Sequence, residues 1–386
     1  MSALRWAAAL GNADWHLAAP LLAALATAWH TDIATVTTGL AAYSLGQGLA
    51  LPLWGWFADR YGPGRSLRTG LLVAAAASVG SALCPGPAWW IALRTAAGAG
   101  FATVTPSVSL CYESLSPAQA RQRAFATLTT VTAASAIASP VLADTVLRCG
   151  SWRPAFAVIA VLTAVTVCRI RAATRPLPGP LPGSPPGPSE AARAAQDPPR
   201  AGAGGRRAAY CTVLGLGAAE GTVMLGLPAL LAPALATAGS RTSTTAVLVT
   251  YALGVLTSTF VLRRHARVWG PRRLLATGGS MGVTGALLAA VVPGTAVLML
   301  SAALLGTAWS YLHTTLQTWL PRLLPPPARA RAASLFSASA ILASSAAVAL
   351  TSSLLQDGRH ATVFAAGGIL CAALTCWTLL VARRWG

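Results

Sequence analysis

Three ionisable residues interrupt stretches of sequence that are otherwise apolar over about 20 residues, the length of a membrane-crossing helix. They are Asp14, Arg94 and Glu220. A charged side chain at the centre of a bilayer costs at least about 2.5–3.5 kcal/mol on insertion scales, so such residues are functional candidates by default. Burial disfavours the ionised form of a carboxyl group and so raises its pKa. Such a group can bind a proton and carry it between the two faces of a membrane. We therefore predict that Glu220, Asp14 and Arg94 take part in proton coupling. The alternative is a structural role, such as an ion pair between Asp14 and Arg94.

A second set of polar residues could contact a small molecule. Trp309, His313 and Gln317 are spaced at i, i+4 and i+8, which places them on one face of a helix. Such a stripe of aromatic and hydrogen-bonding groups suits an organic, partly apolar substrate. The alternative is that Trp309 contacts lipid or a neighbouring helix.

Asn12 and His16 complete the predicted substrate-cavity set. At about 100° per residue, Asp14 lies about 200° from both of them, so the two sets cannot face the same cavity. The seven cysteines form no CxxC pair and no cluster with histidine, so we expect no metal site. No paired carboxylates of a catalytic site occur either.

The elements that must hold these residues are membrane-spanning helices. Hydrophobic residues make up 55% of the 386 residues and charged residues only 10%, whereas a soluble protein has about 25% charged residues. The apolar runs are too long for barrel strands, and only helices satisfy the backbone at so many crossings. Twelve spans are expected, near residues 6–29, 34–57, 68–85, 88–112, 122–143, 153–170, 208–233, 243–262, 273–292, 295–320, 332–355 and 361–382.

The basic residues divide the loops into two classes. All 28 are arginines, and the net charge is +19. One side of the predicted topology holds only Arg148, Arg153, Arg241 and Arg359, and nearly all the others lie on the opposite side, which the positive-inside rule makes cytoplasmic. Both termini are therefore expected in the cytoplasm. No basic segment is interleaved with exposed aromatic residues, so the charge does not indicate a nucleic-acid partner.

The sequence also repeats itself at an offset of 208 residues. Tyr43 matches Tyr251, and Gly46 matches Gly254. Glu220 matches Asn12, so the two halves place a polar group at equivalent points. Parallel repeats of several spans are typical of one large transporter architecture. We expect a first half at residues 1–171, a proline- and glycine-rich cytoplasmic linker at 172–207 and a second half at 208–386.

A motif follows the second span. Gly55, Asp59, Arg60, Gly62 and Arg65 fit the pattern G-x-x-x-D-R-x-G-R-R/K, in which glycines permit a close helix contact and a tight turn. Asp59 would lock one conformation through an ion pair or a helix N-terminus. Pro63 and Gly64 occupy the first basic positions of the pattern, which leaves Arg65.

This motif resembles that of the major facilitator superfamily, and two others agree with it. Arg94-Thr-Ala-Ala-Gly98-Ala-Gly100 resembles the family's R-x-x-x-G-x-G, and Trp152-Arg153 followed by Phe156 resembles its entry to the sixth span. The resemblance implies an all-α membrane protein with twelve helices in two six-helix halves around a central cavity. Spans 1, 4, 7 and 10 would line that cavity, and they carry Asp14, Arg94 and Glu220.

Within this family the chain is most similar to the drug:proton antiporters, because Asp14 precedes Pro20 as their acid precedes a proline. Their fifth span often carries G-x-x-x-G-P-x-x-G-G. Here Ser135, Ser139, Pro140 and Ala143 stand in that segment, so the proline is kept and the glycines are replaced by other small residues.

The expected function is therefore secondary transport across the cell membrane, as proton-coupled efflux of small organic molecules. The alternative within transport is proton-coupled uptake of a sugar or organic metabolite, and a membrane enzyme is a remote alternative. No GxxxxGK[ST] segment is present. We expect no cofactor beyond the proton gradient, no enzymatic activity, and a monomer whose partners are the substrate, protons and the lipid bilayer.

Overall fold

The computed structural model describes residues 2–113, 118–173, 203–237, 244–265, 269–291, 294–324 and 328–385, and within these ranges the chain is almost entirely helical. The helices of the first half are α1 (Ser2–Ala28), α2 (Ile33–Tyr61), α3 (Pro63–Leu83), α4 (Pro87–Phe101), α5 (Val104–Glu113), α6 (Ala118–Arg148) and α7 (Arg153–Ala173). Those of the second half are α9 (Ala203–Gly221), the π-helical turn η1 (Thr222–Gly226), α10 (Leu227–Thr237), α11 (Thr244–His265), α12 (Pro271–Val291), α13 (Thr295–Trp319), α14 (Arg329–Gln356) and α15 (His360–Trp385), with a short 3₁₀ turn, η2, at Leu320–Leu323.

Each of the twelve predicted spans overlaps a helix within the residues that the structure describes. Eight of the described helices are long and apolar enough to cross a membrane by length and composition alone. Two predicted spans are not continuous α-helices: the fourth is interrupted between α4 and α5, and the seventh contains η1. Of the predicted linker, residues 174–202 lie outside the described residues, and helices occupy Ala173 and Ala203 on either side.

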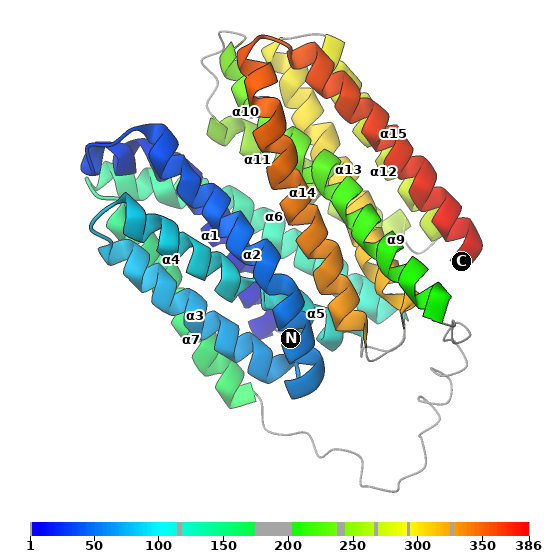
Figure 1. Cartoon of the computed structure of the whole chain (residues 1–386), viewed down its shortest axis with the longest axis horizontal. Coiled ribbons are helices and arrows are strands. Elements are labelled where there is room, and N and C mark those ends of the chain that lie inside the picture. The colour runs from blue at the N-terminus through cyan, green and yellow to red at the C-terminus, as the bar shows by residue number, and fades with distance from the viewer. Residues whose placement is uncertain are drawn as a thin grey trace, which may run out of the picture.

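The helices form two bundles that lie side by side, with α1 to α7 in one and α9 to α15 in the other (Figure 1). The sequence repeat reappears in their packing. A Cβ atom added to Gly46 of α2 would overlap the carbonyl oxygen of Thr95 in α4, and one added to Gly254 of α11 would overlap that of Ala303 in α13. Gly254 lies 208 residues after Gly46, and Ala303 lies 208 residues after Thr95, so the same contact occurs in both halves. These glycines let two helices approach more closely than larger residues would permit.

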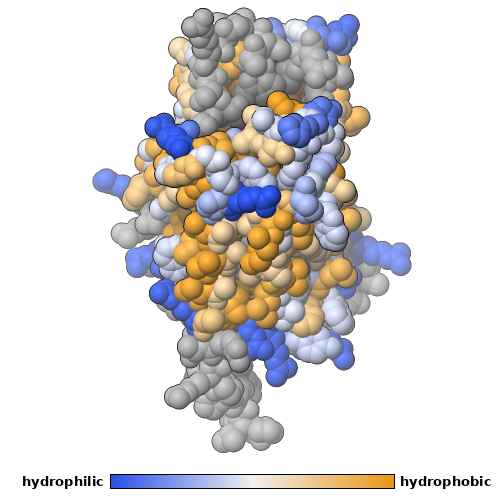
Figure 2. Space-filling view, turned by 90° about the vertical axis from the view of Figure 1, so that its left-hand side faces the viewer, coloured by the Kyte–Doolittle hydropathy of each residue, from blue (hydrophilic) through white to orange (hydrophobic). Residues whose placement is uncertain are grey.

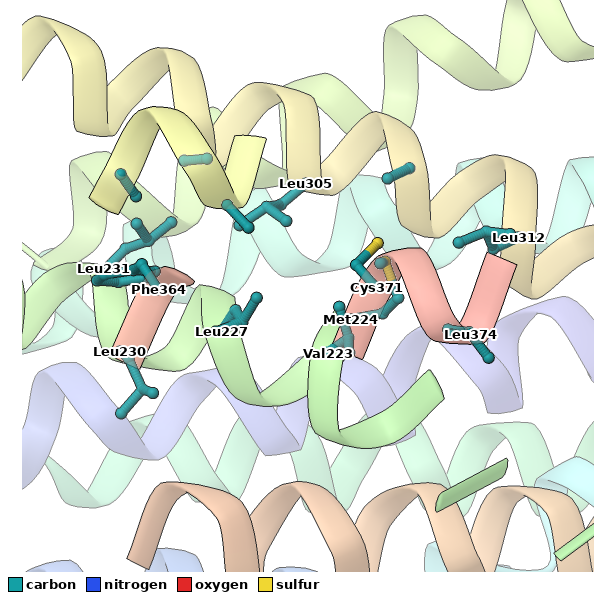
Figure 3. Close-up of a cluster of buried hydrophobic side chains, with 14 of the residues drawn as sticks. Val223, Met224, Leu227, Leu230, Leu231, Leu305, Leu312, Phe364, Cys371 and Leu374 are labelled. Atoms are coloured by element: carbon teal, nitrogen blue, oxygen red, sulfur yellow. The ribbon is translucent and has the colours of Figure 1, made fainter. Parts of the chain in front are cut away.

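Each half has its own hydrophobic core. In the second half, Figure 3 shows Met224 of η1 and Leu227 of α10 beside Leu305 of α13 and Cys371 of α15. A separate buried cluster fills the first half around Tyr43, Trp90 and Phe156. On the outside, Figure 2 shows a broad hydrophobic area over the face of the first half, as expected for a surface that contacts lipid.

The two halves meet mainly through α2 against α14 and α6 against α11. The helices α2 and α14 approach closely at Gly55, where a side chain would collide with Ser334. Further along, Leu51 is buried with Ala338 and Ile341. These contacts lie toward the end of the bundle that carries the exposed side chains of Arg60, Arg65, Arg68, Arg264, Arg272, Arg273, Arg331 and Arg383, which we call the arginine-rich end.

Candidate functional site

A buried carboxylate and an imidazole form the centre of the candidate site in the second half. The Oε1 atom of Glu220 lies 2.9 Å from Nδ1 of His313, and Nε2 of His313 lies 3.1 Å from Nε2 of Gln317. The Glu220 side chain is fully buried, whereas 21% of the His313 side chain is exposed. Because both ring nitrogens of His313 have partners, the orientation of its ring is fixed.

Trp309 stacks on this pair. Its ring centroid lies 4.6 Å from that of His313, with an angle of 14° between the planes. The predicted stripe on one face of α13 is thus present: Trp309 stacks on His313, and His313 is hydrogen-bonded to Gln317. It contacts Glu220 of α9, which the sequence analysis placed in a separate set.

Two polar atoms of this site have no hydrogen-bond partner within the described parts of the chain. They are Oε2 of Glu220 and Nε1 of Trp309, and both are buried. Leaving a buried donor or acceptor unpaired costs about 1–3 kcal/mol. An acceptor and a donor in the same buried site are therefore available to a proton, a water molecule or a substrate group.

The backbone next to Glu220 is unusual. Glu220 lies in the last turn of α9, and η1 begins two residues later at Thr222. Single π-helical turns inside α-helices are rare and often occur at functional sites. Tyr251 of α11 binds the backbone of η1, since its hydroxyl donates to the carbonyl oxygen of Met224 at 3.3 Å.

In the first half, Asp14 and Arg94 form a buried ion pair. Nη1 of Arg94 donates to Oδ2 of Asp14 at 2.8 Å, and Nη2 donates to the backbone carbonyl of Asp14 at 3.0 Å. Both side chains are fully buried. The Arg94 guanidinium also lies 4.4 Å from the ring centroid of Tyr43 and within 6 Å of those of Trp90 and Phe156. This arrangement is the structural alternative considered for Asp14 and Arg94.

Asn12 and His16 lie on a different face of α1 from Asp14, as the angular argument requires. The Asn12 amide donates to the Thr132 carbonyl at 2.7 Å and to Oγ of Ser135 at 3.1 Å, which fastens α1 to α6. His16 is partly buried. Asn12 thus has a packing contact within the first half, and its predicted contact with substrate stays a prediction.

The predicted latch lies where α2 ends at the arginine-rich end. Gly62 has a φ of 86° between α2 and α3, a backbone conformation that glycine adopts without strain. Asp59, which follows the predicted span 34–57, lies against Arg331 in the first turn of α14. Partial burial raises the pKa of Asp59 to about 6, while a backbone hydrogen bond from Arg331 and the charge of that residue act in the opposite direction.

The two arginines of the predicted latch, Arg60 and Arg65, have other surroundings. The Arg60 guanidinium lies 5.8 Å from the ring centroid of Tyr61, and Arg65 is exposed in the first turn of α3. The partner of Asp59 is therefore in the other half of the molecule. The sequence analysis did not identify Arg331 as that partner. An arginine at the start of the eleventh predicted span could have suggested a cationic contact for Asp59.

Comparison with known proteins agrees with this architecture. Residues 6–207 match the family model of the Major Facilitator Superfamily. The chain belongs to this superfamily. Among curated protein sequences, none matches the chain.

Two solved structures of transporters resemble this superfamily member over nearly its whole length. One is the crystal structure of the human organic anion transporter MFSD10 (TETRAN), with a TM-score of 0.78, 16% sequence identity, and coverage of 97% of this chain and 98% of that chain. The other is the proton:xylose symporter XylE bound to 6-bromo-6-deoxy-D-glucose, with a TM-score of 0.78, 15% identity, and coverage of 97% and 94%. At these identities the likeness shows the twelve-helix fold, and it leaves the drug:proton antiporter subtype and the substrate open.

Proposed function

We propose that this protein is a proton-coupled secondary transporter that exports small organic molecules by alternating access. The observation that carries the proposal is the buried contact between Glu220 and His313, at 2.9 Å. Both groups can gain or lose a proton, unlike an arginine, whose charge is permanent. A proton gained or lost by the pair changes its net charge by one, so proton binding at this buried site can be coupled to a change of conformation.

The conformational part of the proposal rests on where the halves touch. Gly55 and Asp59 of α2 lie against the first turns of α14 at the arginine-rich end. We assign this end to the cytoplasm from the distribution of the arginines, so the state described is closed on the cytoplasmic side. Transport then requires this contact to open while the opposite end closes.

The second candidate is proton-coupled uptake. It is favoured by the similarity to a proton:xylose symporter and by the serines and alanine that replace the antiporter glycines in α6. In both cases Glu220 and His313 carry the proton, and Trp309 and Gln317 border the substrate. The two candidates differ in whether the proton and the substrate move in opposite directions or together.

The test is the sign of the pH change when substrate is added to proteoliposomes. A panel of fluorescent organic cations and anions, together with xylose, serves as the probe. An antiporter releases protons into the medium as substrate enters, whereas a symporter removes them, and this sign does not depend on the orientation of the protein. Transport of a panel compound without any pH change would overturn proton coupling. An alkaline shift would overturn export in favour of the second candidate.

A further inference from the structure

A proline directly after the η1 turn removes one of the backbone donors of the seventh span. Pro228 is the second residue of α10. In an α-helix, the residue at this position would donate its N–H to the carbonyl oxygen of Met224, four residues earlier, but proline has no N–H. Met224 is fully buried. Because a buried carbonyl oxygen needs a partner, the Met224 carbonyl requires a donor from another part of the chain.

Tyr251 supplies this donor from a different helix. Its hydroxyl, on α11, donates to the carbonyl oxygen of Met224 at 3.3 Å. The tyrosine packs against the hydrophobic core of the second half and lies within electrostatic reach of Glu220. Tyr251 thus replaces a bond that the proline prevents, about one helical turn from Glu220.

The first half contains the same tyrosine and proline but a different contact. Tyr43 and Pro20 lie 208 residues before Tyr251 and Pro228. The Tyr43 hydroxyl donates to the carbonyl oxygen of Gly11, also at 3.3 Å, which is nine residues before the proline instead of four. There α1 runs through Pro20 as one α-helix. The contact with the carbonyl four residues before the proline therefore occurs together with the π-helical turn.

The helices on both sides of η1 are held by close packing. Before the turn, a Cβ atom added to Gly221 would overlap the carbonyl oxygen of Ala340 in α14. After the turn, Leu227 of α10 contacts Gly367 of α15 so closely that a Cβ atom on this glycine would overlap it. Since neighbours fix α9 and α10, the turn between them determines how one is rotated relative to the other.

This rotation decides where the Glu220 side chain points. A π-helical turn holds one residue more than an α-helical turn. Loss of the extra residue would rotate α9 by about 100° relative to α10. The carboxylate of Glu220, which lies in the last turn of α9, would then leave Nδ1 of His313, from which it is now 2.9 Å away.

We propose that Tyr251 is a positioning residue for the proton site. By donating to the Met224 carbonyl in place of Pro228, it holds the η1 turn and keeps Glu220 in contact with His313. This role rests on the proposed function in one respect, since it takes Glu220 and His313 as the proton site. Tyr251 acts through the backbone of η1 and need not contact the substrate.

The test observes the contact between Glu220 and His313 in the absence of substrate. The full chain is isotopically labelled at the ring nitrogens of its five histidines, reconstituted in lipid and studied by solid-state NMR at one fixed pH. The His313 signals are assigned by their loss in His313→Gln, and Glu220→Ala gives their position without the carboxylate. We expect Tyr251→Phe to shift the His313 signals toward that position, because η1 then loses its donor.

Two further variants separate positioning from a general loss of stability. Tyr43→Phe removes the tyrosine hydrogen bond of the first half and should leave the His313 signals in place. Pro228→Ala, added to Tyr251→Phe, returns an N–H for the Met224 carbonyl and should restore the original signals. This double variant also gives a result if Tyr251→Phe alone folds poorly. Unchanged signals in Tyr251→Phe, or a double variant with the signals of Glu220→Ala, would overturn the proposal.

Transport measurements distinguish this role from the proposed function. In proteoliposomes, Tyr251→Phe should lower the substrate-induced pH change about fivefold relative to counterflow of the same substrate, as expected for the loss of one hydrogen bond. If the unaltered protein transports without any pH change, proton coupling is refuted. A shift of the His313 signals in Tyr251→Phe would still support the positioning role in that case.

Discussion

Two buried carboxylates, Glu220 and Asp14, differ in the chemistry of their partners. Asp14 is bound to an arginine, which stays protonated at every relevant pH. Its pair with Arg94 is enclosed by Tyr43, Trp90 and Phe156 and behaves as a fixed, neutral unit. Glu220 is bound to a histidine, whose side chain is partly exposed. We therefore propose Glu220 for proton coupling and expect Asp14 and Arg94 to stabilise the first half.

Glu220→Gln should abolish proton-driven transport while energy-independent exchange of substrate persists. Glutamine keeps the shape of the protonated acid and the contact with His313, but it cannot release a proton. The measurement compares substrate-induced pH change with counterflow in the same proteoliposomes. The control is Asp144→Asn, which removes an exposed carboxylate bound to Arg148. Normal pH change in Glu220→Gln would leave Glu220 as a hydrogen-bond partner only and would return the coupling role to Asp14.

Asp14→Asn should lower the thermal stability of the protein by about 3–5 kcal/mol, because it leaves the Arg94 charge buried without a counter-charge. Replacing both members, as Asp14→Leu with Arg94→Met, should restore much of this loss, since no buried charge then remains. Thermal unfolding in detergent measures both effects. If the single variant is as stable as the unaltered protein, the pair does not stabilise the fold, and a functional role for Asp14 becomes the better explanation.

At the scale of helices, the sequence predicted the number, order and repeat of the spans. Hydrophobic runs indicate where the chain crosses the membrane, and matched glycines indicate where helices pack closely. It also placed Trp309, His313 and Gln317 on one face, since helix periodicity fixes that spacing. It did not predict η1 or the break after Phe101. Both are changes in backbone hydrogen bonding that leave hydropathy unchanged. Nor could it join Glu220 to His313, because that contact depends on the rotation of α9 and α13 about their own axes.

The repeated glycine contact should be essential in the second half as in the first. Gly254→Val places a branched side chain against the carbonyl oxygen of Ala303, so α11 and α13 must separate. Overpacking of this kind costs about 1–3 kcal/mol or more. Size-exclusion profiles and thermal unfolding should show less folded protein. Gly270→Ala is the matched control, because no atom lies within 4 Å of the added Cβ. Equal behaviour of the two variants would contradict the close approach of these helices.

For the whole molecule, the contacts between the halves indicate one closed end. Thr129 of α6 and Thr314 of α13 add a hydroxyl contact of 3.3 Å across the interface, one residue from His313. His313, which contacts Glu220, and Thr314, which contacts α6, are thus consecutive residues of α13. Asp59 and Arg331 lie farther out, at the arginine-rich end, where the carboxylate itself titrates.

Acidification should therefore favour the state that is closed at the arginine-rich end. With this end closed, partial burial raises the pKa of Asp59 to about 6, whereas a carboxyl group facing water after opening returns to about 4. The closed state binds the proton more tightly, so its advantage is fully present below about pH 4 and is lost as the pH rises through about 6. Distances between spin labels at positions 68 and 264, one in each half, should shorten as the pH falls from about 6 to about 4. Asp59→Asn should remove the dependence, and Asp32→Asn, at the other end of α2, should keep it. A pH response that survives in Asp59→Asn would assign the titration to another group.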